Sequence, residues 1–310
     1  WIGVAAQVNA MNLHGLPTAF ELNVTSLNLL YNIADSSPSP AKLDWDSVSQ
    51  VSATALGALD HTIDLQVSGS LDVNIGGFVL AAGTFDISQK SGQTIDDTPG
   101  TGTGIELGNA SVLIIRLTDV FLFVGVDGVF ERDADGVVTG FPTVENDAGK
   151  GLEAEGAVGF FVDDASLDLV IIGEDPTLPA ARSWVGVAGF LNVMSVAGLP
   201  DGFDMRISDV EFLYNIAAAD NSKIDWQGLA GTNSDLAATE LDRMTDDIEL
   251  SVAGSLYISI ANFIYLSGRL ALQRRELFAK TVGGSASSKL SALLLGASSL
   301  KAFVGVGDPD

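Results

Sequence analysis

The chain of 310 residues contains no cysteine, which excludes disulfide bonds and thiolate chemistry. It has only two histidines, and 15 basic residues stand against 40 acidic ones, giving a net charge of −25. This shortage of cations argues against nucleic-acid binding, which needs clustered positive charge to displace counterions from phosphate. It also argues against adsorption to anionic lipid. Apolar runs are short, and none approaches the ~20 residues of a membrane span.

Charged residues make up only 18% of the chain, so its acidity reflects scarce lysine and arginine rather than acidic tracts. Such a balance suits a salty, calcium-bearing exterior, where screening relieves self-repulsion beyond ~8–10 Å. A hydrophobic content of 47% with only nine prolines speaks against disorder. We therefore expect a folded protein with a substantial core.

What the chain does contain is a long internal repeat. Residues 1–5 (WIGVA) return as residues 184–188 (WVGVA), an offset of 183 positions, and residues 123–126 (FVGV) return as residues 303–306. We predict a complete first unit over residues 1–183 and an incomplete second unit over residues 184–310, in an array that continues. Repeats of this kind stack on their neighbours, so they are usually built for length or multiplicity.

The clearest periodicity in the sequence is two. Apolar and polar residues alternate from Ile63 to Ile75, and again from Ile248 to Ile260. This pattern is typical of a half-buried strand in an antiparallel sheet. At ~3.3 Å per residue each stretch spans roughly 43 Å, which suits an extended sheet better than a compact sandwich.

The alternation changes phase inside several predicted strands. The first strand pair carries its apolar residues at even positions up to Val24 and at odd positions from Leu27 onward, and the second copy slips between Ile207 and Val210. A third slip falls at Asp163-Asp164. One extra residue in a strand is a β-bulge, which bends the strand, and glycines within strands permit close backbone approach.

Two stretches indicate short helices after the Asp-Trp pairs. Residues 46–59 place apolar residues near helical spacing, and Ser234 is a candidate N-cap for a helix over residues 235–244. Together these features predict an all-β tandem-repeat protein with one short helix per repeat. Its elongated antiparallel sheet is expected to curl into a β-superhelix or flattened tube.

Asp127, Asp133 and Asp135 form the best candidate for an ion site. The run Asp133-Ala134-Asp135-Gly136 lets carboxylates and a carbonyl converge around a tight turn, as Ca²⁺ requires. The bidentate glutamate of a full calcium loop is not evident, and Asp-Gly is also the commonest hairpin turn. A plain hairpin therefore competes with a Ca²⁺ site, and no other cofactor is predicted.

The remaining titratable residues give little sign of catalysis. His14 and His61 have no histidine counterparts in the second copy, and no nucleophile, base and orienting group is apparent. We therefore expect no enzyme. The acidic pairs at 96–97, 163–164 and 246–247 are poor acid–base dyads, because adjacent strand residues point to opposite faces. Calcium binding between modules is an alternative role for them.

Several aromatic residues recur in both copies. In Asp44-Trp45 and Asp225-Trp226 we interpret the tryptophan as an anchor for a helix start on the sheet and the aspartate as an N-cap. A binding site or carboxylate pair is the alternative, but recurrence favours packing. The residues that we interpret as structural are Trp45, Trp226, Tyr31, Tyr214, Phe78 and Phe263.

Several blocks carry a resemblance to known proteins: residues 67–73 (VSGSLDV), 77–79 (GFV), 43–45 (LDW) and the two FVGV blocks. They resemble the tandem β-rich units of very large repetitive secreted or surface proteins of environmental bacteria, often grouped with adhesins and haemolysin-type calcium-binding proteins. The resemblance implies an extracellular or cell-surface location and a structural or adhesive, calcium-compatible protein. The Gly-Gly-x-Gly-x-Asp calcium repeats of haemolysin-type toxins are absent, so no binding residues carry over.

The function expected from these features is structural. The chain would be a non-enzymatic segment of a large extracellular fibre, stalk or matrix protein that contacts neighbouring repeats and self-associates into fibres through exposed strand edges. One alternative is an adhesin region that binds glycan or a surface, which needs an exposed aromatic or Asp/Asn cluster in one copy only. Another is an elongated hydrophobic groove that carries lipid, which predicts an open, uncovered apolar face. Neither a nucleic-acid partner nor a membrane span is expected.

Overall fold

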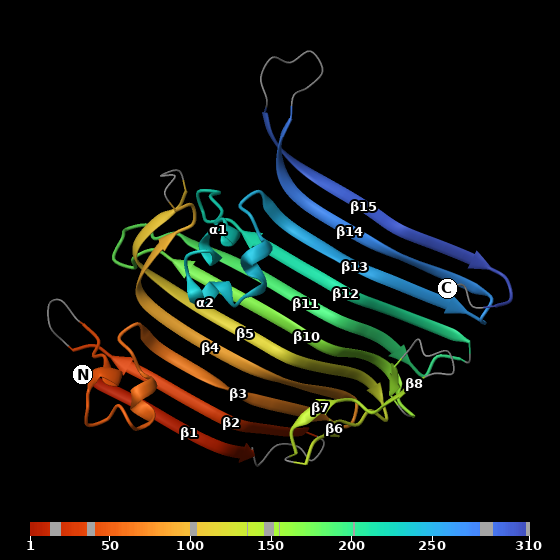
Figure 1. Cartoon of the computed structure of the whole chain (residues 1–310), viewed down its shortest axis with the longest axis horizontal. Helices are drawn as coiled ribbons and strands as arrows, with labels where there is room; N and C mark the ends of the chain where they lie inside the picture. Colours follow the sequence, from red (N-terminus) through yellow and green to blue (C-terminus); the bar gives the residue numbers. More distant parts are fainter. Residues whose placement is uncertain are drawn as a thin grey trace.

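One antiparallel sheet of 11 strands dominates the computed structural model of the chain (Figure 1). The strand order is β1-β2-β3-β4-β5-β10-β11-β12-β13-β14-β15, so that the chain meanders from one edge of the sheet to the other. The structure describes residues 1–12, 20–35, 41–99, 104–134, 136–145, 152–154, 156–200, 202–279 and 288–307. The prediction of an all-β antiparallel fold is confirmed.

The strands are long, as the alternation predicts. The first copy supplies β1 (Ile2–Asn12), β2 (Phe20–Ile33), β3 (Ile63–Ile75), β4 (Val79–Asp96), β5 (Glu106–Val126) and β10 (Val158–Gly173). The second copy supplies β11 (Ser183–Ala197), β12 (Phe203–Ile216), β13 (Ile248–Ile260), β14 (Ile264–Ala279) and β15 (Ser288–Val304). The predicted strands at 63–75 and 248–260 are confirmed, and the predicted unit boundary lies at the start of β11.

Three insertions leave the meander. Between β5 and β10 lie two small hairpins, β6 (Glu131–Arg132) with β7 (Val138–Gly140) and β8 (Thr143–Glu145) with β9 (Leu152–Ala154). Short helices follow β2 and β12 in matching places: η1 (Trp45–Ser47) and η2 (Ala55–Ala58) in the first copy, and α1 (Trp226–Ala230), α2 (Ser234–Ala237) and η3 (Glu240–Arg243) in the second. Among the described helices, none is long and apolar enough to cross a membrane.

The helical segments are confirmed in place but not in length. Residues 235–244 form two short turns instead of one helix, because the Thr239 hydroxyl accepts a hydrogen bond from Leu241 N and begins a new turn. The predicted cap is off by one residue. Asn233 is the N-cap of α2, and its side-chain oxygen accepts hydrogen bonds from Asp235 N and Leu236 N.

The predicted bulges are confirmed. The register shifts where the phase slips, and the bulge residues Ser26, Asp164 and Asp209 have φ of 53°, 57° and 50°. Asp119 and Ser299 form two further bulges of the same kind. Glycines of neighbouring strands lie against four of these bulges: Gly69, Gly83, Gly254 and Gly268. The absence of a side chain leaves room for the displaced backbone.

Gly69→Val tests this pairing of bulge and glycine. A Cβ at Gly69 would lie 3.1 Å from Thr25 O and 3.3 Å from Leu27 Cα, both backbone atoms of the bulged strand. We expect the substitution to lower the free energy of unfolding by about 1–3 kcal/mol, because the ladder must shift to admit the side chain. Urea unfolding measures this loss. Gly108→Val is the matched control, since a Cβ there meets nothing within 4 Å. Equal effects of the two substitutions would contradict the packing argument.

The expected curl into a superhelix or tube is wrong for this part of the protein. Over the described residues the sheet stays open, with β1 and β15 at its two edges (Figure 1). The bulges of β5, β10 and β12 lie at a similar level along their strands. A bulge bends its own strand, whereas closure also requires consistent strand tilt and stagger around the whole sheet.

One face of the sheet carries the insertions, and we call it the covered face. At one strand end the segment from Ala217 to Asp247, with α1, α2 and η3, packs over β4, β5, β10, β11 and β12 around the buried side chains of Trp184 and Trp226. At the other end Phe123, Phe141 and Phe161 form a smaller core beneath the hairpin insertion. Both insertions lie in front of the sheet in Figure 1.

Candidate functional site: an uncovered apolar sheet face

The opposite face of the sheet, which we call the apolar face, is built by the bulges. Each bulge reverses the alternation, so apolar residues at even positions on one side of it and at odd positions on the other side point the same way. Val24 therefore shares a face with Leu29. One row of cross-strand partners reaches all eleven strands: Ala6, Leu29, Val67, Ile87, Ile115, Leu169, Val187, Tyr214, Leu250, Arg274 and Leu293.

A second row lies on the other side of the bulges. It runs through Leu22, Val73, Ala81, Leu122, Val162, Met194, Ile207, Leu256 and Gly268. Arg274 is the single charged member of the two rows. The apolar character of this face therefore extends across both repeats and both halves of the strands.

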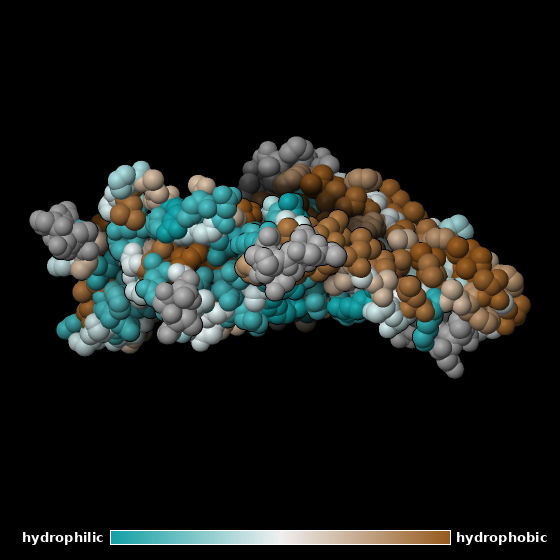
Figure 2. Space-filling model, turned by 90° about the horizontal axis from the view of Figure 1, so that it is seen from above, coloured by the Kyte–Doolittle hydropathy of each residue, from teal (hydrophilic) through white to brown (hydrophobic). Residues whose placement is uncertain are grey.

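Much of the apolar face is exposed. Its large side chains with more than a third of their surface exposed include Val4, Val8, Tyr31, Ile75, Val126, Val158, Leu167, Tyr214, Ile216, Ile260, Ile264, Leu266, Leu270, Leu293, Leu295 and Val304. Strand spacing and rise give the sheet a projected area of about 2,000 Å². Apolar patches on soluble monomers rarely exceed a few hundred Å², and larger ones mark contact surfaces. Figure 2 shows hydrophobic residues gathered toward one end and one long side.

Polar contacts on the covered face tie the second unit to the first. The buried carboxylate of Asp168 on β10 accepts from Arg116 Nε at 3.1 Å and from Glu240 N of η3 at 2.9 Å. Lys90 of β4 pairs with Asp235 of α2 at 2.6 Å. Asp97 accepts from Asp225 N at 3.0 Å. The helical insertion of the second unit is therefore held by strands and a loop of the first.

The two Asp-Trp motifs anchor their insertions, as predicted. Trp45 Nε1 donates to Asn32 Oδ1 at 3.1 Å, and Trp226 Nε1 donates to Asn215 Oδ1 at 3.0 Å. The indole rings lie against glycines of the sheet, Trp45 on Gly3 and Trp226 on Gly186. Both asparagines are buried, and in each the side-chain amide also donates to two insertion carbonyls.

The predicted aspartate caps differ between the copies. Asp225 Oδ1 accepts from Gly228 N at the start of α1, as expected. Asp44 instead accepts from the ring and the backbone N–H of His61, and the hydrogen bond from the His61 side chain is the main cause that lowers the pKa of Asp44. His61 is exposed, and His14 lies outside the described residues.

The other recurring aromatic residues lie on the surface. Tyr31 and Tyr214 stand at equivalent places on the apolar face, and Phe78 and Phe263 occupy the hairpin tips after β3 and β13. All four are exposed. The tips are nevertheless tied to the next strand, since Gly125 N donates to Phe78 O and Gly305 N donates to Phe263 O, both at 2.9 Å.

The structure tests the calcium site only in part, because Asp135 lies outside the described residues. Asp127 ends β5 with a φ of 59°, and Asp133 closes the turn between β6 and β7 by accepting from Val137 N at 2.9 Å. This turn favours the hairpin interpretation for Asp133. Among the residues that the structure describes, no group of three or more His, Cys, Asp or Glu side chains is placed to hold a metal ion. Calcium at Asp127, Asp133 and Asp135 stays a prediction.

Asp163 offers a test of stability against pH. Burial raises the pKa of Asp163, and the neighbouring Asp164 raises it further. The folded state therefore prefers the protonated acid, so stability is lost as pH rises from the unfolded-state pKa through the folded-state pKa. Asp163→Asn removes this cost, and we expect it to raise the free energy of unfolding near pH 7 by up to about 1 kcal/mol.

The gain from Asp163→Asn should vanish at low pH, where the carboxyl is protonated in both states. Thermal unfolding of the two proteins between about pH 3 and pH 7 measures the difference. Asp209→Asn, at the bulge of β12, is the control, because Asp209 is exposed and its φ of 50° suits asparagine. A gain for Asp163→Asn that is independent of pH would show that the charge is not its cause.

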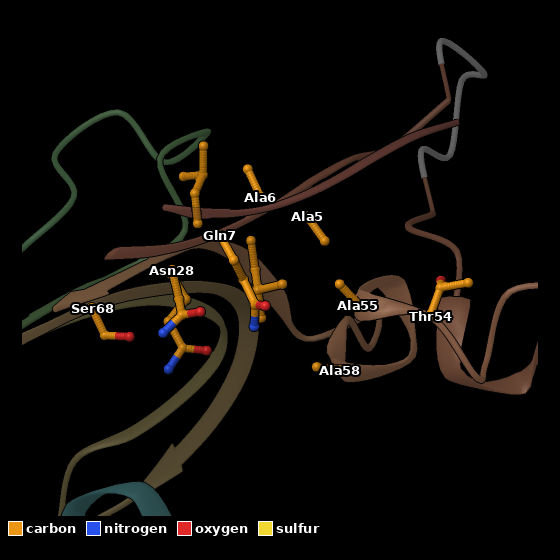
Figure 3. A pocket seen from close by; sticks show the side chains of 11 residues that line it. Ala5, Ala6, Gln7, Asn28, Thr54, Ala55, Ala58 and Ser68 are labelled. Atoms are coloured by element: carbon orange, nitrogen blue, oxygen red, sulfur yellow. The ribbon is translucent and has the colours of Figure 1, made fainter. Parts of the chain in front are cut away.

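A pocket of about 370 Å³ lies between η2 and the covered face of β1, β2 and β3 (Figure 3). Two residues that are smaller than their counterparts line it: Ala58 and Gln7 stand where the second copy has Arg243 and Phe190. Its other polar lining includes the side chains of Asn28, Gln66 and Ser68. Sequence analysis missed this pocket, although the size difference between the copies is visible in the repeat alignment.

No protein-family model matches the chain, and neither the curated proteins nor the solved structures contain a match.

Proposed function

We propose that the chain is a non-enzymatic structural segment of a large extracellular or cell-surface fibre, stalk or matrix protein. The observation that carries this proposal is the junction between the repeats. β10 and β11 pair continuously from Gly159 opposite Ala197 to Gly173 opposite Ser183. This ladder is as long as those within a unit, so each added unit lengthens one sheet rather than adding a tethered domain.

Two further features support rigidity at the junction. The helical insertion of the second unit packs on β4, β5 and β10 of the first, and its core contains Val170, Ile172 and Leu236 together. The Asp168 and Lys90 contacts add polar links across the same boundary. An array joined in this way resists bending between units, as a stalk or fibre requires.

Spin-label distances test this proposal directly, since the chain has no cysteine and single labels can be placed freely. Labels at Ser52 and Asp242, both exposed and in different units, are expected to give one narrow distance distribution. Labels at Asp242 and Ser298, both in the second unit, serve as the control. A narrow control distribution with a broad distribution between units would show independent bodies and overturn the proposal.

The apolar face gives the segment a surface for self-association. Its projected area of about 2,000 Å² exceeds the roughly 800 Å² that each partner buries in a stable complex. Two copies placed face to face would bury apolar rows while their acidic side chains stay outside, at the ~10 Å spacing of stacked sheets. We propose a second copy of the chain as the partner of this face.

Lipid carriage is the second candidate, because it requires an open apolar face and none of the described segments covers this one. The fluorescence of an acyl-chain probe, added to the purified chain at concentrations that keep it monomeric, would test it. Saturable binding that Leu256→Asp removes would favour a carrier, and no binding would remove this candidate. The adhesin alternative stays a prediction, since no observation favours it.

A further inference from the structure

The two copies differ sharply at their first tryptophan. Trp184 Nε1 donates to Ser222 O at 3.1 Å, and Trp1 Nε1 donates to the corresponding Ala41 O at 2.8 Å, so both rings are held in the same way. Trp184 is 0% exposed, whereas Trp1 is 61% exposed. Arg182 also lies over the Trp184 ring, 4.9 Å from its centroid. A single guanidinium covers at most one face of a ring, so local contacts do not account for its complete burial.

The preceding unit covers Trp184. The core around this ring includes side chains from the end of β4, the start of β5 and the end of β10: Ile95, Leu107, Ala110, Val112, Ile114, Val170 and Ile172. All of them belong to the first unit. The strand beneath Trp184, β11, is an interior strand paired with β10, whereas its counterpart β1 is an edge.

The helical insertions show the same difference. Leu229 and Leu241 of the second insertion are buried, while the corresponding Val48 and Leu56 of the first are only half-buried. The insertion of the second unit closes on the first through Glu240 N and Asp168. The first insertion has apolar residues at the same two positions but no strands beneath that side among the described residues.

The composition of β1 is that of an interior strand. Edge strands usually carry charged residues or proline, which prevent other strands from pairing with them. The segment Ile2–Asn12 (IGVAAQVNAMN) has neither, and its residues are mostly exposed. β1 therefore presents an unprotected row of backbone donors and acceptors.

We propose that the β1 edge and the first insertion form a docking surface for another unit of the same repeat type. The incoming unit pairs a strand equivalent to β10 with β1 in the antiparallel direction. The end of its β4 and the start of its β5 then cover Trp1, as they cover Trp184 in this chain. The edge strand β15 of a second copy cannot take the place of this β10-like strand. β15 corresponds to β5, and β5 runs parallel to β11, the counterpart of β1. The proposal rests on the proposed structural function and names the surface through which the sheet grows.

A fused chain tests the docking surface. Residues 1–183 are joined in front of the whole chain, so that Ser183 precedes Trp1 as it naturally precedes Trp184. A single cysteine replaces Ala5 in the junction copy, since the corresponding Ala188 is 0% exposed. We expect its reaction rate with a thiol reagent to fall at least about 100-fold relative to Ala5→Cys in the unfused chain. Ser298→Cys, remote from the junction, should react equally in both.

An unchanged rate at Ala5→Cys in a folded fusion would overturn the docking proposal. If that variant does not fold, acrylamide quenching with Trp1→Phe replaces it. In the unfused chain, Trp1→Phe should remove tryptophan fluorescence that acrylamide quenches. In the fusion, the same substitution at the junction should remove only fluorescence that acrylamide does not quench. An equal loss of quenchable fluorescence from both proteins would overturn the proposal. A narrow Ser52–Asp242 distribution alongside a reactive junction thiol would leave the structural function intact and refute the docking surface alone.

Discussion

Trp226→Ala is expected to lower the free energy of unfolding by about 3–5 kcal/mol, the usual cost of deleting a buried aromatic side chain. The ring is 1% exposed, packs against Gly186 and lies in the core that joins the second insertion to the first unit. Its loss also leaves the buried Asn215 Oδ1 without its donor. Urea unfolding followed by circular dichroism measures the change.

Trp45→Ala is the matched control for this prediction. Trp45 makes the same hydrogen bond and lies against the equivalent glycine, but it is only half-buried. We expect a loss of about 1–2 kcal/mol, because less apolar surface returns to water. Equal losses for the two substitutions would show that the tryptophans act only within their own units, and would remove the argument that the second insertion locks the units together.

Leu256→Asp is expected to weaken self-association of the chain at least about 100-fold, since an unpaired charge inside an apolar interface costs several kcal/mol. Leu256 lies in an inner row of the apolar face, between Ile207 and Gly268. The side chain is half-exposed in the single chain, so the folded unit should tolerate the change. Sedimentation over a range of protein concentrations measures the dissociation constant.

Ser255→Asp is the control that distinguishes a charge on the apolar face from a charge on the covered face. Ser255 is adjacent to Leu256 on β13 but points to the covered face, opposite Arg269 and Ser208. It adds the same charge to the same strand, and self-association should be unchanged. If both variants weaken association equally, net charge rather than the apolar face governs it. A wild-type chain that stays monomeric at high concentration would refute the face-to-face pairing.

The strands were the most predictable part of the fold because their signal is local. Alternation from Ile63 to Ile75 requires only that each residue point opposite to its neighbour, and the strand has those bounds. The phase slips at Ser26 and Asp209 located the bulges for the same reason. The helical turns were harder, since Thr239 and Asn233 compete as caps within a few residues.

Only part of the candidate site could be predicted from the sequence. The apolar side chains of the uncovered face are plain in the alternation, but no local pattern distinguishes an apolar face that is covered from one that is open. Trp1 and Trp184 have nearly identical neighbours in sequence, yet one is exposed and the other buried. Burial here is decided by strands of the preceding unit, namely the end of β4, the start of β5 and the end of β10.

The sequence by itself determined the repeat, the long antiparallel strands, the bulges that keep each apolar set on one face, and the tryptophan anchors. Each of these depends on neighbouring residues or on a motif that occurs twice. Only the tertiary structure decided that the sheet stays open, that the second insertion closes over the first unit, and that one face is left bare. These outcomes depend on how strands from distant segments are ordered and covered, and the backbone geometry of a single strand does not specify that.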